Sequence, residues 1–252
     1  MTRIILLFLI VCSSSQICGA QIINVESLRH VSDSSKWSGS ASLDLGLIKN
    51  TNSIFRITNR IRLQYNTEKN LFLFINDINL QKIEDNSFVN RGIQHFRYNR
   101  KLGDRIKLEA FVQSQYDAIS DIKFRGLLGL GPRFKLSKNE NFRYYLGTLF
   151  MYEHEETLER SINILRDFRG SAYLSCSLYP TENLSIVSTT YYQPLIKQFS
   201  DFRISSEASL AFKIFENLAF RTSFSYNFDA NPIANIPKTQ YELTNGIIYS
   251  FD

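Results

Sequence analysis

Apolar and polar side chains alternate with a period of two over almost all of the chain after Trp37. Between Phe55 and Tyr65, every second residue except Asn59 is apolar, and the residues between them are polar or basic. An α-helix would scatter these apolar side chains around its axis, whereas a β-strand places them on one face. The alternation therefore predicts a chain built of strands.

The same alternation recurs and predicts about twelve strands. Their expected ranges are 38–48, 54–65, 71–80, 88–100, 105–117, 122–135, 142–154, 164–178, 184–194, 202–214, 218–229 and 240–251. Strands that cross a bilayer have about 9–11 residues, whereas strands of soluble proteins average about 5–6. In a soluble sandwich the apolar face packs inward, and in a membrane barrel it meets lipid. Strand length favours the barrel.

Aromatic residues support the same interpretation. The chain contains 20 Phe and 13 Tyr, and several lie on the apolar face near strand ends: Phe55, Tyr65, Phe96, Tyr98, Phe142, Tyr152, Tyr241, Tyr249 and Phe251. Aromatic girdles at both membrane interfaces are typical of outer-membrane barrels. We predict an all-β fold, a transmembrane antiparallel up-and-down β-barrel of about 12 strands over residues 37–252. The alternative is a soluble periplasmic β-sandwich binding protein.

The N-terminus has the pattern of a secretory signal peptide. Arg3 precedes an apolar run over residues 4–11, and small residues up to Ala20 provide a cleavage site. The apolar run is too short to span a bilayer. Neither Cys12 nor Cys18 follows a small residue, which disfavours a lipoprotein signal.

We expect residues 1–20 to be removed and residues 21–36 to lie in the periplasm. Cys176 would then be the single cysteine, so no intramolecular disulfide could form. The formal charge of +5 is mild and spread along the chain, which argues against a nucleic-acid partner. A mean hydropathy of −0.18 excludes a protein with several membrane-spanning helices.

The expected connections fall into two groups. The short polar turns are Asn66–Asn70, Lys101–Asp104, Tyr179–Asn183 and Phe215–Asn217, and the longer connections are Glu155–Asn163, Leu195–Asp201 and Asp229–Thr239. In outer-membrane barrels, short turns face the periplasm and long loops face the outside. An even number of strands then puts both ends of the chain on one side of the membrane, which we expect to be the periplasmic side.

The segment Gly126-Leu-Leu-Gly-Leu-Gly131 has the look of a phosphate-binding loop. A dinucleotide fingerprint has the order Gly-x-Gly-x-x-Gly and opens a helix, whereas this segment has a different order and continues into Pro132. Strand alternation points Leu128 and Leu130 to lipid and Gly129 and Gly131 inward, where they leave room for bulky neighbours. We interpret the segment as half of a hairpin, with Gln113 and Gln115 across from the glycines.

This hairpin also carries a family resemblance. The strings EAFVQSQYD at Glu109–Asp117 and RGLLGLGPRF at Arg125–Phe134 resemble the YdiY-like salt-induced outer-membrane proteins, a domain family of unknown function. Further matches are Tyr145–Gly147 with Tyr152-Glu153, Thr190–Pro194, Asp201–Arg203 and Gly246–Phe251. The resemblance covers the chain from about Trp37 onward and implies an outer-membrane β-barrel. It implies no catalytic residues, because the family has no established activity.

Motifs of barrel enzymes are not found in the sequence. Outer-membrane phospholipases carry His-x-Ser in the barrel, but here that motif occurs only at His30-Val-Ser32, before the barrel. Omptin-type proteases use Asp-x-His, which does not occur. His154 lies among Glu153, Glu155 and Glu156, which suits a cation site or an acid–base group, but we interpret this set as the solvated rim of a loop. We predict no catalytic, metal-binding or cofactor-binding site, and Cys176 is expected on the apolar face as a small hydrophobe.

Inward-facing polar residues are better candidates for function. The candidate lumen-lining residues are Arg56, Arg60, Arg62, Glu109, Gln113, Gln115, Arg125, Arg169, Arg203, Glu207, Arg221 and Glu242. One interpretation is a lining that selects a small polar or anionic solute, as rings of charge do in pores. The other is a salt-bridged plug that fills the interior, as side chains fill small barrels.

The sequence therefore predicts an exported Gram-negative outer-membrane protein that is not an enzyme. Its role would be structural, related to envelope or salt stress as the resemblance implies, or that of a small-solute channel. The alternative within the barrel class is a phospholipase- or protease-like enzyme. Expected partners are outer-membrane lipid, small solutes or ions, and the barrel-assembly machinery, which would bind the last strand ending at Phe251. We expect a monomer.

Overall fold

A computed structural model describes residues 36–49, 53–83, 86–137, 139, 141–158, 164–215, 218–232 and 236–249. The described residues form twelve strands: β1 (Trp37–Lys49), β2 (Ser53–Asn66), β3 (Asn70–Ile83), β4 (Asn86–Lys101), β5 (Ile106–Asp117), β6 (Ile122–Lys135), β7 (Phe142–Thr157), β8 (Ile164–Thr181), β9 (Leu184–Leu195), β10 (Gln198–Phe215), β11 (Leu218–Asp229) and β12 (Thr239–Tyr249). Among the described residues, none forms a helix long and apolar enough to cross a bilayer. The all-β fold predicted from the alternation is confirmed.

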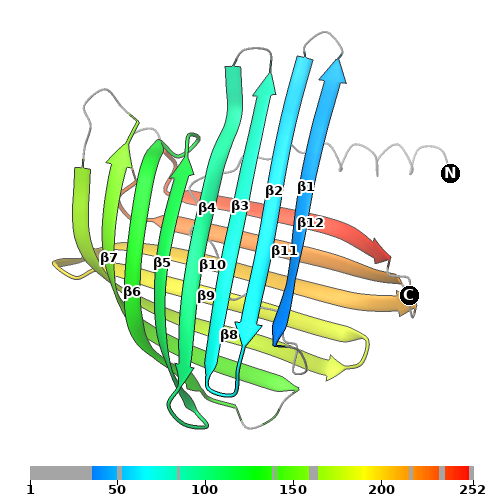
Figure 1. The fold of residues 1–252 in the computed structure, drawn as a ribbon, viewed down its shortest axis with the longest axis vertical. Helices are drawn as coiled ribbons and strands as arrows, with labels where there is room; N and C mark the ends of the chain where they lie inside the picture. Colours follow the sequence, from blue (N-terminus) through cyan, green and yellow to red (C-terminus); the bar gives the residue numbers. More distant parts are fainter. Residues whose placement is uncertain are drawn as a thin grey trace.

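The strands form one up-and-down sheet in which each strand pairs with its neighbours in sequence. Every pairing is antiparallel, from β1–β2 through to β11–β12. The sheet curls so that β8–β12 pass behind β1–β6 (Figure 1). Within the described residues, β1 and β12 are the two edges of the sheet. The curl gives the sheet a concave inner face and a convex outer face.

The two faces have opposite composition, as the alternation predicts. Val112, Leu128 and Leu130 lie on the outer face with exposed fractions of 52%, 59% and 54%. On the inner face, Glu109 and Arg125 are buried, although charged side chains are normally the most exposed residues. The curled sheet therefore has apolar side chains on its exposed outer face and charged side chains in its interior, which is the reverse of a soluble protein.

Aromatic side chains form rows on the outer face at both ends of the strands. At the end that holds Trp37, ring contacts run from Trp37 to Tyr65, Phe72 and Tyr98 across β1–β4. Toward the other end, the rings of Tyr192, Phe202 and Phe228 are in contact, whereas those of Tyr152 and Phe168 meet farther inside β7 and β8, next to Leu128 of β6. The predicted placement of aromatics at strand ends is confirmed for Tyr65 and Tyr98.

An apolar cluster fills part of the interior. It consists of Phe111, Leu149, Met151, Tyr173 and Tyr191, with Leu127 packed against it. Glycines make this packing feasible. A Cβ at Gly129 would collide with the ring of Phe111, and a Cβ at Gly147 would collide with the ring of Tyr173. The predicted role of the inward glycines, to leave room for bulky neighbours, is confirmed at Gly129.

Two details of the predicted hairpin need correction. The register places Phe111 opposite Gly129 and Glu109 opposite Gly131, whereas Gln113 and Gln115 lie opposite Leu127 and Arg125. Gly131 makes room for backbone, because the Cα of Leu149 would lie 2.6 Å from a Cβ at this position.

Two of the predicted longer connections also need correction. The first, Glu155–Asn163, is shorter than expected, because β7 continues to Thr157. The second, Leu195–Asp201, was expected to be a long loop, but β10 starts at Gln198, so residues 196–197 alone join β9 to β10. A register shift between Gln198 and Phe202 explains the error, because it interrupts the alternation on which the prediction rested. The signal peptide over residues 1–20, almost all of segment 21–36, His30, Ser32 and Phe251 lie outside the described residues.

Candidate functional site

All twelve candidate lumen-lining residues lie on the inner face of the sheet. Paired residues of antiparallel strands point to the same side, so the register can be followed from strand to strand. Gln115 pairs with Arg125, which pairs with Glu155, and Arg203 pairs with both Gln193 and Asp229. Arg60 lies on the same face, because it pairs with Asp77, which pairs with Ile93. Glu242 also lies on this face, because it pairs with Ser225, which pairs with Glu207.

The inner-face candidates differ sharply in burial. Six of them are buried among the described residues: Glu109, Gln113, Gln115, Arg125, Arg169 and Arg203. Arg62, Glu207 and Glu242 are half-buried, and Arg56, Arg60 and Arg221 are exposed. The buried candidates all come from β5–β10, where the curl of the sheet brings strands across from one another.

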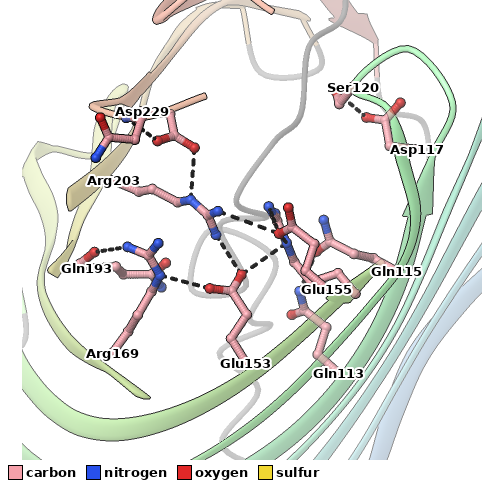
Figure 2. Close-up of polar contacts among 12 residues, drawn as sticks. Gln113, Gln115, Asp117, Ser120, Glu153, Glu155, Arg169, Gln193, Arg203 and Asp229 are labelled. Carbon is pink, nitrogen blue, oxygen red and sulfur yellow. Dashed lines mark hydrogen bonds and ion pairs between the residues drawn. The ribbon is translucent and has the colours of Figure 1, made fainter. Parts of the chain in front are cut away.

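The largest polar cluster joins β6, β7, β8 and β10 (Figure 2). Arg125 Nε donates to Glu155 at 2.6 Å, and Arg169 Nε donates to Glu153 at 2.8 Å. Arg203 Nη1 donates to Glu153 Oε1 at 2.5 Å. Glu153 therefore accepts from side chains on both sides of the interior. We call the residues Arg125, Arg169, Arg203, Glu153 and Glu155 the central ion network.

Two more carboxylates extend this network toward the end of the sheet. Asp229 accepts a hydrogen bond from Arg203 Nε at 2.9 Å, and Asp201 lies 3.0 Å from Arg169 Nη1. Three guanidinium groups thus face four carboxylates, so the extended cluster carries a net charge of one negative. A buried ion cluster tolerates a missing partner poorly, because the remaining charge is left without compensation.

Glu153 and Glu155 correct the sequence interpretation. The sequence pattern predicts a solvated rim formed by Glu153, His154, Glu155 and Glu156, but Glu153 and Glu155 are 3% and 1% exposed. β7 continues to Thr157, so strand alternation extends through this stretch and sends Glu153 and Glu155 inward. His154 and Glu156 point outward and contact each other at 3.2 Å. The continued alternation through Met151, Glu153 and Glu155 was the signal that could have revealed them.

A second buried cluster lies on the far side of the apolar cluster. The Glu109 carboxylate is fully buried and accepts a hydrogen bond from Arg97 at 3.2 Å and another from the Tyr173 hydroxyl. Arg133 donates to that hydroxyl at 3.3 Å and stacks over Tyr145 with 4.1 Å between the guanidinium carbon and the ring centroid.

The chain of contacts continues along β4 and β5. Arg97 donates to His95, which shares a hydrogen bond of 2.9 Å with Gln113, and Gln113 donates to Gln115 at 2.7 Å. Arg97, His95, Arg133 and Tyr173 were not among the predicted residues. In sequence they are isolated polar residues on an alternating face, and only the register brings them together.

A cavity of about 150 Å³ lies at the end of the central ion network. The connections β5–β6 and β11–β12 contribute Ser120, Asn231 and Lys238 to its wall. Arg125, Glu155, Arg169, Asp201, Arg203, Asn227, Asp229 and Gln240 supply most of its polar lining. This is the end of the sheet at which the longer connections were predicted.

No group of three or more His, Cys, Asp or Glu in the described part of the chain could hold a metal ion. Cys176 is half-buried on the outer face, as expected for a small hydrophobe. That the protein is not an enzyme stays a prediction.

The sequence matches a known family over the whole of the described sheet. Residues 33–251 match the family described as "Protein of unknown function, DUF481". The chain belongs to this family. The membership confirms the resemblance that was drawn from the Glu109–Phe134 hairpin and its companion motifs. No curated protein is significantly similar to the chain in sequence.

Among solved structures, limited similarity is found to a porin, a toluene transporter and an outer-membrane secretin. A structure described as "NanC porin structure in rhombohedral crystal form" has a TM-score of 0.49 at 9% identity, covering 83% of this chain and 100% of that one. The Pseudomonas putida toluene transporter TodX has a TM-score of 0.42 at 9% identity, covering 84% of this chain and 78% of that one. A bacterial polysaccharide outer membrane secretin has a TM-score of 0.43 at 6% identity, covering 80% and 84%.

Proposed function

We propose that the chain is an outer-membrane β-barrel that passes small polar or ionic solutes through one side of a partly filled interior. The observation that supports this most is the inverted polarity of the sheet. Outward leucines such as Leu128 are more than half exposed, while inward Glu109 and Glu153 are almost fully buried. A bilayer is the environment in which an apolar outer wall with aromatic rows at both ends is stable.

Closure of the barrel is part of this proposal. A bilayer offers no hydrogen-bond partners to an open sheet edge, so β1 and β12 would have to pair or be covered in the membrane. The inner-face residues near these edges, Arg56, Arg60 and Arg221, are exposed, unlike those of β5–β8. Closure would place them around the part of the interior that the apolar cluster does not fill.

We propose that this side of the interior favours anions. β2 presents Arg56, Arg60 and Arg62 in a row on the inner face, and Asp77 lies 3.6 Å from Arg60 as a partial counter-charge. Basic residues that line a narrow pore select for anions because they lower the electrostatic barrier to them. A role in salt or osmotic stress, which the family resemblance implies, would fit a pathway for small ions.

The test is single-channel conductance of the refolded protein in a planar bilayer, with a salt gradient to measure the reversal potential. We expect discrete steps with anion preference, and we expect the double variant Arg60→Glu, Arg62→Glu to move the reversal potential toward cations. The matched control reverses Lys69 and Arg105, which are exposed in turns at one end of the sheet. A folded protein without conductance steps would contradict the channel and support a filled barrel with a structural role.

A further inference from the structure

We infer that the cavity at the end of the central ion network is a binding site for a small organic ammonium compound, one that carries a single positive charge and N–H donors. The inference depends on the fold of the barrel but not on conduction. It begins with three acceptor atoms that lack hydrogen-bond partners among the described residues: Glu155 Oε1, Asn227 Oδ1 and Gln240 Oε1.

These three residues all line the same cavity. Asn227 and Gln240 pair directly across β11 and β12, so their side chains lie next to each other on one wall. Glu155 comes from β7 and is 1% exposed, and Asn227 is 8% exposed. A buried acceptor without a donor costs free energy, and three such atoms around one cavity indicate that donors belong inside it.

The arginines that line the cavity already donate to other groups. Arg203 donates to Asp229, Glu153 and Glu155, and Arg169 donates to Glu153 and to the Gln193 carbonyl. The arginines therefore hold the carboxylates in place and do not approach Glu155 Oε1. A ligand that supplies N–H groups would satisfy acceptors that the protein leaves open.

The charge of the site indicates a cation. Three guanidinium groups face the four carboxylates of Glu153, Glu155, Asp201 and Asp229. Asp167 is compensated by Lys197 at 2.5 Å, and Lys238 in the wall is exposed to solvent, which screens its charge. Asp201 and Asp229 are themselves 16% and 26% exposed, so the cation is indicated by the buried Glu155 carboxylate, whose Oε1 accepts from no donor, and not by a count of buried charges.

The wall also distinguishes an organic cation from a metal ion. Ile122 and Leu165 point inward beside the polar groups of the cavity, and they would contact the carbon chain of an amine. Neighbouring guanidinium groups would repel a divalent ion. A volume of about 150 Å³ is well above the roughly 10–15 Å³ that a single water needs, so a small organic molecule has room.

The test is isothermal titration calorimetry on the refolded full-length protein in detergent. The probes are n-butylammonium, tetramethylammonium, glucose and calcium chloride. We expect n-butylammonium to bind and tetramethylammonium, which has the same charge but no N–H donor, to bind about tenfold more weakly. Equal affinity for the two ammonium ions, preference for calcium or glucose, or no binding by any probe would each overturn the inference.

Variants locate the binding to this cavity. Glu155→Gln should weaken n-butylammonium binding about tenfold, whereas Glu207→Gln, on the same face but outside the cavity wall, should leave it unchanged. Because Glu155→Gln also disturbs the ion network, Asn227 gives a second test. Asn227→Leu should weaken binding, and Asn227→Asp should tighten it, since it adds a negative charge. An unchanged affinity in Asn227→Leu and Asn227→Asp would refute the site.

Failure of this inference can be separated from failure of the proposed function. A protein that keeps heat-modifiable migration on gels and binds no ammonium ion contradicts the ligand site alone. Loss of heat-modifiable migration in the unmutated protein would contradict the membrane barrel.

Discussion

Arg203 on β10 and Glu153 on β7 form an ion pair of 2.5 Å although fifty residues separate them in the sequence. The two strands are not neighbours in the sheet, so this pair crosses the concave interior. The hydrogen bond from Tyr173 on β8 to Glu109 on β5 crosses it in the same way. Such contacts hold the curl of the sheet, because they join strands that no backbone ladder connects.

Removal of the Glu153 charge should therefore destabilise the fold strongly. Glu153 compensates Arg125, Arg169 and Arg203, all of them buried. We expect Glu153→Gln to lower the free energy of unfolding by about 3–5 kcal/mol, because three buried guanidinium groups lose a shared partner. Denaturant titration in lipid vesicles measures this change.

Glu242→Gln is the matched control for Glu153→Gln. Glu242 is half-buried on the inner face of β12, outside the central ion network, and its loss should cost less than about 1 kcal/mol. Equal effects of the two substitutions would show that the central network does not stabilise the curl.

Gly129→Ala tests the packing between β5 and β6. A Cβ at Gly129 would collide with the Phe111 ring, so we expect a loss of about 1–3 kcal/mol in unfolding free energy. Gly46→Ala is the control, because its nearest neighbour would be the Cβ of Arg56 at 3.6 Å. In a double-mutant cycle, Phe111→Leu should reduce the cost of Gly129→Ala. Independent effects would contradict the predicted contact.

Trp37, the single tryptophan of the chain, reports the position of the aromatic row. It is 66% exposed, and its ring centroid lies 4.6 Å from that of Tyr65. Aromatic girdles lie at the headgroup level of a bilayer. Trp37 fluorescence should be quenched more by lipids brominated near the headgroup than by lipids brominated at the chain end. The reverse order would contradict an interfacial position.

The strands and their faces could be predicted from the sequence because a strand repeats every two residues. The alternation assigns Arg125 and Arg203 to the polar face. In a membrane barrel the polar face points inward, and the structure places both residues there. The prediction of strand bounds failed where the apolar–polar alternation is interrupted. The register shift between Gln198 and Phe202 made the start of β10 look like a loop.

The composition of the site could not be predicted, because it depends on contacts across the interior. The sequence places Glu153 beside His154 and gives no sign that Arg203 lies against it. Arg60 and Arg203 look alike in sequence, yet one is exposed and the other is buried. Their exposure differs because the curl of the sheet brings β7 and β10 together across the interior, whereas it leaves the inner face of β2 open.

The central claim is that the outer wall of this sheet lies in a bilayer, and two leucines test it most directly. Leu128 in the middle of β6 and Leu102 in the β4–β5 turn are 59% and 61% exposed. Arginine at mid-bilayer on a barrel wall costs about 2–4 kcal/mol, whereas at an exposed turn it costs little.

The measurement is the free energy of unfolding from lipid vesicles for Leu128→Arg and Leu102→Arg. We predict a loss of about 2–4 kcal/mol for Leu128→Arg and less than about 0.5 kcal/mol for Leu102→Arg. Equal, small losses for the two variants would show that Leu128 faces water, and would contradict the membrane barrel.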